Sequence, residues 1–196
     1  MINLRSAAER TATVIAELGD EHLALSTPCP EYCVGDLLDH MEGLAQAFTD
    51  AALKTPSVGG QQGPSGDVRR LTPGWQRRIP DRLATLARAW EDPAAWDGMT
   101  QAGGIDMPGE IAGVVALNEV IAHGWDLARA TGQPFDADEA HVAACIEVMG
   151  PAADEERPVG TGVPFGRPVV PAPDAAPVER LAAVLGRDPS WTPTQA

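Results

Sequence analysis

Glu119 and His123 are two ionisable residues whose spacing places them on one face of a predicted helix. The segment from Gly109 to Ala130 has helical periodicity. At about 100° per residue, both side chains share a stripe with the apolar Val120 and Leu127. A buried carboxylate without a partner costs roughly several kcal/mol, so this stripe requires a cation, a hydrogen-bond network or a metal ion. The metal ion is the most specific of these hypotheses, because carboxylate oxygen and imidazole nitrogen are both ligands of divalent cations.

A third candidate ligand, His40, lies on a second stripe that faces the core. It shares one helical face with Leu37 and Leu44. Together, His40, Glu119 and His123 would supply two imidazole nitrogens and one carboxylate from two helices, and they would leave a coordination position open for water or substrate. Three protein ligands with an open position are typical of a catalytic Zn²⁺ site, and Ni²⁺, Fe²⁺ or Co²⁺ accept the same ligands.

Other interpretations of these residues remain open. A glutamate and a histidine four apart on a helix are also typical of a solvated surface pair, and His40 could be a hydrogen-bonded core residue. Cys29 and Cys33 could contribute to a thiolate-rich zinc site with His40, or they could be two ordinary reduced thiols. The sequence alone does not show that the two helices meet.

Several polar residues near these candidates could support a metal centre. Either Asp126, about one turn after the histidine of the later helix, or Asp39, beside the other histidine, could orient an imidazole. Asp126 could equally be a helix-end charge or a cap for a neighbouring loop. Arg69 and Arg70 could bind a substrate carboxylate, although a solvated pair of arginines explains them more simply.

Composition and charge restrict the classes of function open to this chain. Its 196 residues are 44% hydrophobic, and 14 Lys and Arg against 28 Asp and Glu give a formal net charge of −14. This charge argues against binding nucleic acid or an anionic membrane by general electrostatics, so we expect a small-molecule ligand. No apolar run approaches the roughly 18 residues that span a bilayer, and the N-terminus lacks the pattern of a secretion signal. With only three cysteines, the sequence predicts a cytoplasmic protein without a disulfide framework.

Apolar periodicity, together with proline and glycine stops, predicts helices joined by mostly short connections. A glycine-rich loop at residues 55–66 is expected to be flexible and could act as a lid, and residues 91–108 are expected to be irregular. The predicted helices are a first from Asn3 to about Leu25, a second from Val34 to Lys54, a third that starts between Asp67 and Pro73, a fourth from Gly109 to Ala130, a fifth after Asp136 or Asp138, and a short last helix from Val178 to Leu185.

This pattern predicts an all-α fold, a four-helix bundle with an extra helix and a proline-rich C-terminal tail. We expect residues 1–150 to form a metal-binding helical bundle and residues 151–196 to form a wrapping or partly disordered tail with a short helix. Helical bundles hold metal ions between facing helices in their cores. The second and fourth predicted helices would bring the three candidate ligands together in this way.

Four stretches of the chain carry a family resemblance: Thr27–Tyr32 (TPCPEY), Asp36–His40 (DLLDH), Asn118–Gly132 (NEVIAHGWDLARATG) and Arg180–Trp191 (RLAAVLGRDPSW). They resemble the DinB-like superfamily, specifically actinobacterial metal-binding proteins related to the N-terminal domain of mycothiol-dependent maleylpyruvate isomerase. The resemblance implies a divalent metal, usually zinc, held by residues that match His40, Glu119 and His123. The isomerases also carry a C-terminal domain that helps bind substrate, where this sequence has only the tail and a short helix.

The resemblance and the open metal position together imply a function. We expect a divalent-metal-dependent, thiol-using S-transferase or isomerase that acts on a small electrophile, with zinc as the metal and mycothiol as the cosubstrate. A metal-binding stress-response or ligand-binding module without catalysis and a metal-dependent hydrolase are the alternatives. The residues neither identify the electrophile nor decide whether the bundle forms a homodimer.

Overall fold

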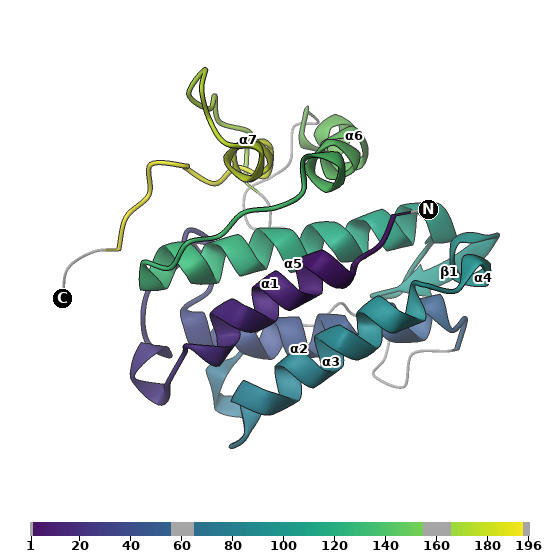
Figure 1. Cartoon of the computed structure of the whole chain (residues 1–196), viewed down its shortest axis with the longest axis horizontal. Coiled ribbons are helices and arrows are strands. Elements are labelled where there is room, and N and C mark those ends of the chain that lie inside the picture. The colour runs from purple at the N-terminus through teal and green to yellow at the C-terminus, as the bar shows by residue number, and fades with distance from the viewer. Residues whose placement is uncertain (1, 56–64, 155–165, 194–196) are drawn as a thin grey trace.

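The chain folds as a bundle of four helices, and two further helices pack against one member of that bundle (Figure 1). This computed structural model describes residues 2–55, 65–154 and 166–193. The bundle helices are α1 (Arg5–Ala16), α2 (Val34–Ala52), α3 (Trp75–Ala89) and α5 (Gly109–Thr131). Both α1 and α2 pack on α3 and on α5, so the four helices enclose one core. The predicted all-α bundle is confirmed.

Helix α5 is the element around which the rest of the chain packs. It contacts α1, α2, α6 and α7, and neighbours therefore cover most of its circumference. A helix enclosed in this way is apolar on all sides, and Leu117, Ile121 and Leu127 are all fully buried. Any polar side chain on α5 must therefore find its partner inside the protein.

Gly124 allows α1 to approach α5 closely. A Cβ atom at this position would lie 2.3 Å from Oγ1 of Thr11 and 2.8 Å from the ring of Phe135. The Thr11 hydroxyl instead donates a hydrogen bond to the carbonyl oxygen of Val120, at 3.0 Å. The missing side chain thus sets the distance between the two helices, and α5 is held in register against α1.

The first helix is shorter than its sequence pattern predicts. It ends at Ala16 rather than near Leu25, and a short 3₁₀ turn, η1 (Asp20–His22), follows it. Gly19 has extended backbone angles and its N–H donates to Nδ1 of His22, at 2.9 Å. Leu18 is buried although it lies beyond the helix. The apolar spacing therefore continued past the point at which the backbone left the helix.

The third helix also begins later than predicted. Residues Val68–Arg70 form a separate 3₁₀ turn, η2, and α3 starts at Trp75. Gly74, just before it, has a left-handed backbone with φ of 84°. A residue in this conformation cannot continue a helix from the preceding turn, so the predicted start between Asp67 and Pro73 was wrong.

A short helix and a β-hairpin occupy the segment that was expected to be irregular. They are α4 (Pro93–Trp96), β1 (Met99–Ala102) and β2 (Ile105–Pro108), and the two strands pair antiparallel. Gly103 and Gly104 connect the strands with φ of 57° and 80°. Positive φ at both central residues is typical of the type I′ hairpin turn, which glycine adopts without strain.

Helices α6 (Glu139–Asp154) and α7 (Pro177–Val184) pack on each other and on α5. Figure 1 shows them on the side of α5 that faces away from α1, α2 and α3. After α7 the backbone passes directly over Gly166, because a Cβ at Gly186 would lie 2.4 Å from the Gly166 carbonyl carbon. Gly186 has φ of 78°, which also favours glycine.

Parts of the predicted organisation lie outside the described residues. These are most of the glycine-rich loop proposed as a lid, residues 56–64, and residues 155–165 of the proline-rich tail. The division of the chain at residue 150 stays a prediction; α6 continues to Asp154. Within the described ranges, no helix is both long and apolar enough to cross a bilayer.

Candidate metal centre

Three side chains from two helices converge in the core. His40 comes from α2, and Glu119 and His123 come from α5. Each offers one ligand atom, and these atoms all lie within 4.8 Å of one another. Oε2 of Glu119 lies 3.0 Å from Nε2 of His123 and 3.7 Å from Nε2 of His40. The structure therefore brings together the three residues that the sequence singled out.

The cluster is almost completely shielded from solvent. The side chains of His40, Glu119 and His123 are 6%, 8% and 0% exposed. Burial by itself raises the pKa of Glu119, but contacts with the two imidazoles outweigh burial and hold this pKa well below its ordinary value. The carboxylate is therefore negatively charged inside the bundle, where a cation is its natural partner.

Asp126 defines which nitrogen of His123 faces the cluster. Its Oδ2 lies 3.1 Å from Nδ1 of His123, one turn further along α5. Burial raises the pKa of Asp126, but Arg187 and His123 lower it further, so this carboxylate is ionised and can only accept hydrogen bonds. Nδ1 of His123 must then carry a proton and donate it to Asp126, which leaves Nε2 directed at Glu119.

The atoms at the centre of the cluster fit a divalent cation. With the proton of His123 on Nδ1, Nε2 and Oε2 of Glu119 are two acceptors only 3.0 Å apart. Within the described part of the chain, neither atom has a hydrogen-bond partner. Two acceptors at this distance require a positive charge between them, either a second proton on His123 or a metal ion. Two ligands of one tetrahedral zinc ion lie about 3.4 Å apart, which is between the two distances from Oε2 of Glu119.

The C-terminal segment reaches the cluster through Arg187. Its Nη2 donates to Oδ2 of Asp126 at 3.0 Å, and its Nε lies 3.3 Å from Oδ1 of the same carboxylate. Both side chains are buried, with 2% and 0% exposure. Sequence reasoning gave Arg187 no role, because nothing in the spacing along the chain links it to a partner 61 residues earlier.

Tyr32 covers the imidazole of His40. Their ring centroids lie 5.3 Å apart with an interplanar angle of 38°. His40 also meets His123 edge to face, with ring centroids 5.1 Å apart. Both histidine rings are thus fixed by packing as well as by the polar contacts, which limits how far Nε2 of either one can move.

A small apolar hollow adjoins Glu119 between α2, α3 and α5. Its volume is about 10 Å³, and Glu119 is the one charged residue that lines it, beside side chains such as Met41, Phe48 and Leu86. This volume holds about one water molecule. The apolar walls give the carboxylate no hydrogen-bond donor, which strengthens its dependence on the two imidazoles.

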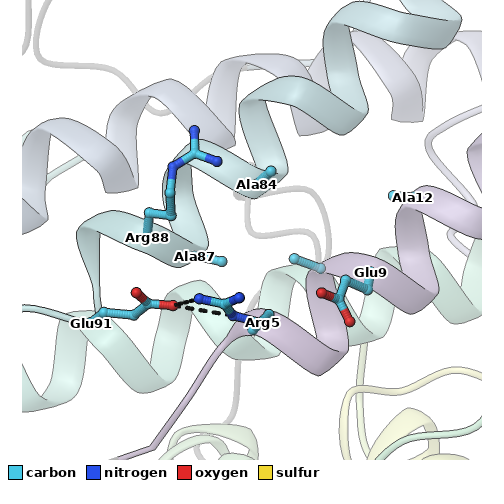
Figure 2. Close-up of a pocket in the computed structure, with 8 residues that line it drawn as sticks. Arg5, Glu9, Ala12, Ala84, Ala87, Arg88 and Glu91 are labelled. Atoms are coloured by element: carbon cyan, nitrogen blue, oxygen red, sulfur yellow. Dashed lines mark hydrogen bonds and ion pairs between the residues drawn. The ribbon is translucent and has the colours of Figure 1, made fainter.

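A larger surface hollow of about 190 Å³ lies between α1 and α3 (Figure 2). Four of the eight residues that line it are alanines, including Ala8 and Ala87, and Figure 2 shows Arg5 paired with Glu91. None of the three cluster residues lines it. We attribute this hollow to the small side chains where the two helices meet, and we take the buried cluster as the candidate site because the donor atoms converge there.

The other residues considered from the sequence have structural partners. Oδ2 of Asp39 accepts hydrogen bonds from the Asp67 amide and from Arg70, so this oxygen binds the segment that precedes α3. Arg69 pairs with Asp67. Neither arginine is therefore directed at the cluster.

The two cysteines close to His40 do not join the cluster either. Cys29 is buried, and burial raises its pKa to about 12. The Cys33 thiol donates to Oδ2 of Asp36, at 2.9 Å. Among the described residues, the group able to hold a metal ion contains no cysteine. The thiolate-rich zinc site is therefore not supported.

Comparisons with known proteins place this chain in a family. It is 28% identical over 193 residues to "Uncharacterized protein Rv0738" of Mycobacterium tuberculosis strain H37Rv, with 92% of this chain and 93% of the relative covered. "Uncharacterized protein MT0763" of M. tuberculosis strain CDC 1551 matches with the same identity and coverage. A crystal structure of a mutant of the mycothiol-dependent maleylpyruvate isomerase matches 76% of this chain and 66% of its own, with 14% identity and a TM-score of 0.49.

The family model that matches the chain covers residues 4–128, which include α1, α2, α3 and the three cluster residues. This match spans well over half of the 196 residues. The resemblance read from the sequence motifs is therefore confirmed, and the chain belongs to the family of the mycothiol maleylpyruvate isomerase N-terminal domain.

Proposed function

We propose that this protein is a divalent-metal-dependent enzyme that uses a low-molecular-weight thiol to act on a small electrophile, as an S-transferase or an isomerase. The observation that carries the proposal is the convergence of the ligand atoms of His40, Glu119 and His123 within 4.8 Å. Family membership supports a thiol of the mycothiol type. Zinc is the metal that this set of two imidazoles and one carboxylate suits first, while nickel, iron or cobalt would accept the same ligands.

Each residue of the cluster has a distinct part in this proposal. Nε2 of His40 and Nε2 of His123 are neutral nitrogen ligands, and Glu119 supplies one negative charge. Asp126 fixes the proton of His123 on Nδ1, so that Nε2 stays available. Tyr32 packs on His40 and keeps its ring in place. Because protein atoms provide three ligands, a fourth position is left for a sulfur or oxygen atom from outside the protein.

A divalent cation held by His40, Glu119 and His123 would supply the positive charge that stabilises the thiolate form of a thiol at neutral pH. The thiolate sulfur is the nucleophile that adds to an electrophilic carbon. In an isomerase the thiol is released again after rotation about the former double bond, and in a transferase it remains on the product. The burial of the cluster excludes bulk water, which favours attack by sulfur over hydrolysis.

The proposal is tested by metal content and by thiol consumption in the same preparation. We expect about one divalent metal ion per chain by elemental analysis and metal-dependent consumption of mycothiol with a panel of small electrophiles, including maleylpyruvate. His40→Ala should remove both properties. His22 lies outside the cluster, where its Nδ1 accepts a hydrogen bond from the Gly19 amide, so His22→Ala should retain them. Tight metal binding without any thiol adduct, isomerised product or hydrolysis product would refute an enzymatic role.

The second candidate is a metal-binding or ligand-binding module without catalysis. The near-complete burial of the three side chains favours this candidate, because a substrate would have to reach atoms that are at most 8% exposed. It predicts that metal and small ligands raise the unfolding temperature while thiol consumption stays at the level of the uncatalysed reaction. The electrophile panel therefore separates the two candidates.

A further inference from the structure

We propose that Arg187, in the segment after α7, is a positioning residue for the metal centre, which acts through Asp126 on the orientation of His123. The inference rests on the metal centre proposed above and adds a contribution from the C-terminal segment. The observation that supports this inference is a continuous series of buried contacts. It runs from Arg187 to Asp126, then to His123 and Glu119, at distances between 3.0 and 3.3 Å.

The contact between Arg187 and Asp126 fixes both oxygens of the carboxylate. Nη2 of the guanidinium donates to Oδ2 at 3.0 Å, and Nε lies 3.3 Å from Oδ1. A planar guanidinium that meets a carboxylate at two points defines the plane of that carboxylate, which a single-point contact does not. Oδ2 is also the atom that accepts the Nδ1 proton of His123. The direction of that hydrogen bond is therefore set by Arg187.

Arg187 is itself held rigidly. Its amide donates to the carbonyl oxygen of Ala182 at 2.9 Å, and Nη1 of its side chain donates to the carbonyl oxygen of Leu185 at 3.2 Å. The guanidinium is buried on all sides, with 2% exposure. Because both its backbone and its side chain are held, a shift of the C-terminal segment would move the guanidinium and, with it, the carboxylate of Asp126.

A second arginine provides a matched control. Arg129 on α5 also binds the C-terminal segment, because its Nη2 donates to the carbonyl oxygens of Pro189 and Trp191 at 2.9 and 2.8 Å. It packs over the ring of Trp125, with 5.7 Å between the guanidinium carbon and the ring centroid. These contacts are to the C-terminal segment and to Trp125 rather than to Asp126. Loss of Arg129 should therefore loosen the C-terminal segment without removing the guanidinium that faces Asp126.

The experiment uses the metal-free full-length protein and observes the Nδ1 proton of His123 by ¹⁵N-edited NMR. In the wild type and in Arg129→Met we expect a slowly exchanging Nδ1–H signal, identified by its absence in His123→Gln. In Arg187→Met the signal should disappear or exchange rapidly. Arg187→Lys, which keeps the charge but offers one donor group in place of the planar fork, should give an intermediate exchange rate. This milder variant also provides the test if Arg187→Met does not fold.

Cobalt binding to the same variants tests the consequence for the metal centre. Replacing residues that orient metal ligands typically costs about 10- to 100-fold in affinity. We expect a loss in this range for Arg187→Met, a smaller loss for Arg187→Lys and a change below about twofold for Arg129→Met. An unchanged Nδ1–H signal in Arg187→Met or Arg187→Lys, or an equal loss in Arg129→Met, would overturn the role of Arg187. Failure of the wild type to bind cobalt would instead refute the proposed metal centre, while the NMR result would still decide how Arg187 affects His123.

Discussion

Nε2 of His40 and Oε2 of Glu119 lie 3.7 Å apart, although they come from different helices of the bundle. The separation is too long for a good hydrogen bond and close to that of two ligands on one cation. It exists only because α2 and α5 pack directly against each other. The proposed metal centre therefore depends on this helix pair and not on either helix alone.

Glu119→Gln should weaken metal binding without unfolding the bundle. The amide has nearly the same shape as the carboxylate, but it lacks the negative charge that attracts the cation. We expect an affinity loss of at least tenfold by isothermal titration calorimetry with Zn²⁺, and a far-ultraviolet circular dichroism spectrum identical to that of the wild type. The exposed Glu21→Gln on η1 serves as the control and should bind zinc normally. Equal affinities for all three proteins would show that Glu119 is not a ligand.

Metal should stabilise the fold in a concentration-dependent manner. A ligand that binds only the folded state at 100 times its dissociation constant adds about 2.7 kcal/mol to the free energy of unfolding. Urea titrations with and without excess Zn²⁺ should therefore differ by about this amount for the wild type and by nearly nothing for His40→Ala. If a chelator lowers the stability of both proteins equally, the effect does not arise at this cluster.

Metal binding should become weaker as the pH falls. Burial lowers the pKa of His123, but contacts with Asp126 and Glu119 raise it further, so the net shift is upward. The protonated imidazole stabilises the metal-free fold below the ordinary pKa of histidine, and this contribution is lost as the pH rises through the raised pKa. A metal ion must displace the proton from Nε2. The increase in unfolding temperature caused by Zn²⁺ should therefore be larger at pH 8 than at pH 6, with proton release in calorimetry at the lower pH.

Gly124→Ala should destabilise the bundle whether or not metal is present. The new methyl group would lie 2.3 Å from Oγ1 of Thr11, so α1 and α5 would have to move apart. Overpacking of this kind costs about 1 to 3 kcal/mol. Gly150→Ala in α6, where a Cβ atom meets nothing within 4 Å, should instead be neutral or stabilise by up to about 1 kcal/mol. Urea denaturation of both variants measures the difference.

Much of the candidate site could be predicted from residue spacing. Helical periodicity placed Glu119, His123 and His40 on core-facing stripes, because the 3.6-residue period is a local property of the backbone. The meeting of α2 and α5 depends on tertiary packing, which residue spacing does not show, and it was expected from the bundle architecture and from the family resemblance. The pairing of Arg187 with Asp126 had no local signal, because the two residues lie 61 positions apart and meet only when the segment after α7 packs on α5.

The ends of the helices were harder to predict for a related reason. Leu18 continues the apolar spacing of α1 and is buried, yet the backbone has already left the helix at that point. Burial patterns report which side chains face the core, and they do so equally for a helix and for the turn that follows it. The backbone is extended at Gly19, between α1 and η1, and left-handed at Gly74, between η2 and α3.

Because Gly186 crosses directly over Gly166, even a substitution that adds only a methyl group should displace the adjacent Arg187. A methyl group on Gly186 would clash with the main chain at Gly166 and push the guanidinium of Arg187 away from α5. In a saturation mutagenesis screen that measures zinc retention, substitutions of Gly186 should therefore reduce zinc binding. A search limited to chemically reactive residues would overlook this position.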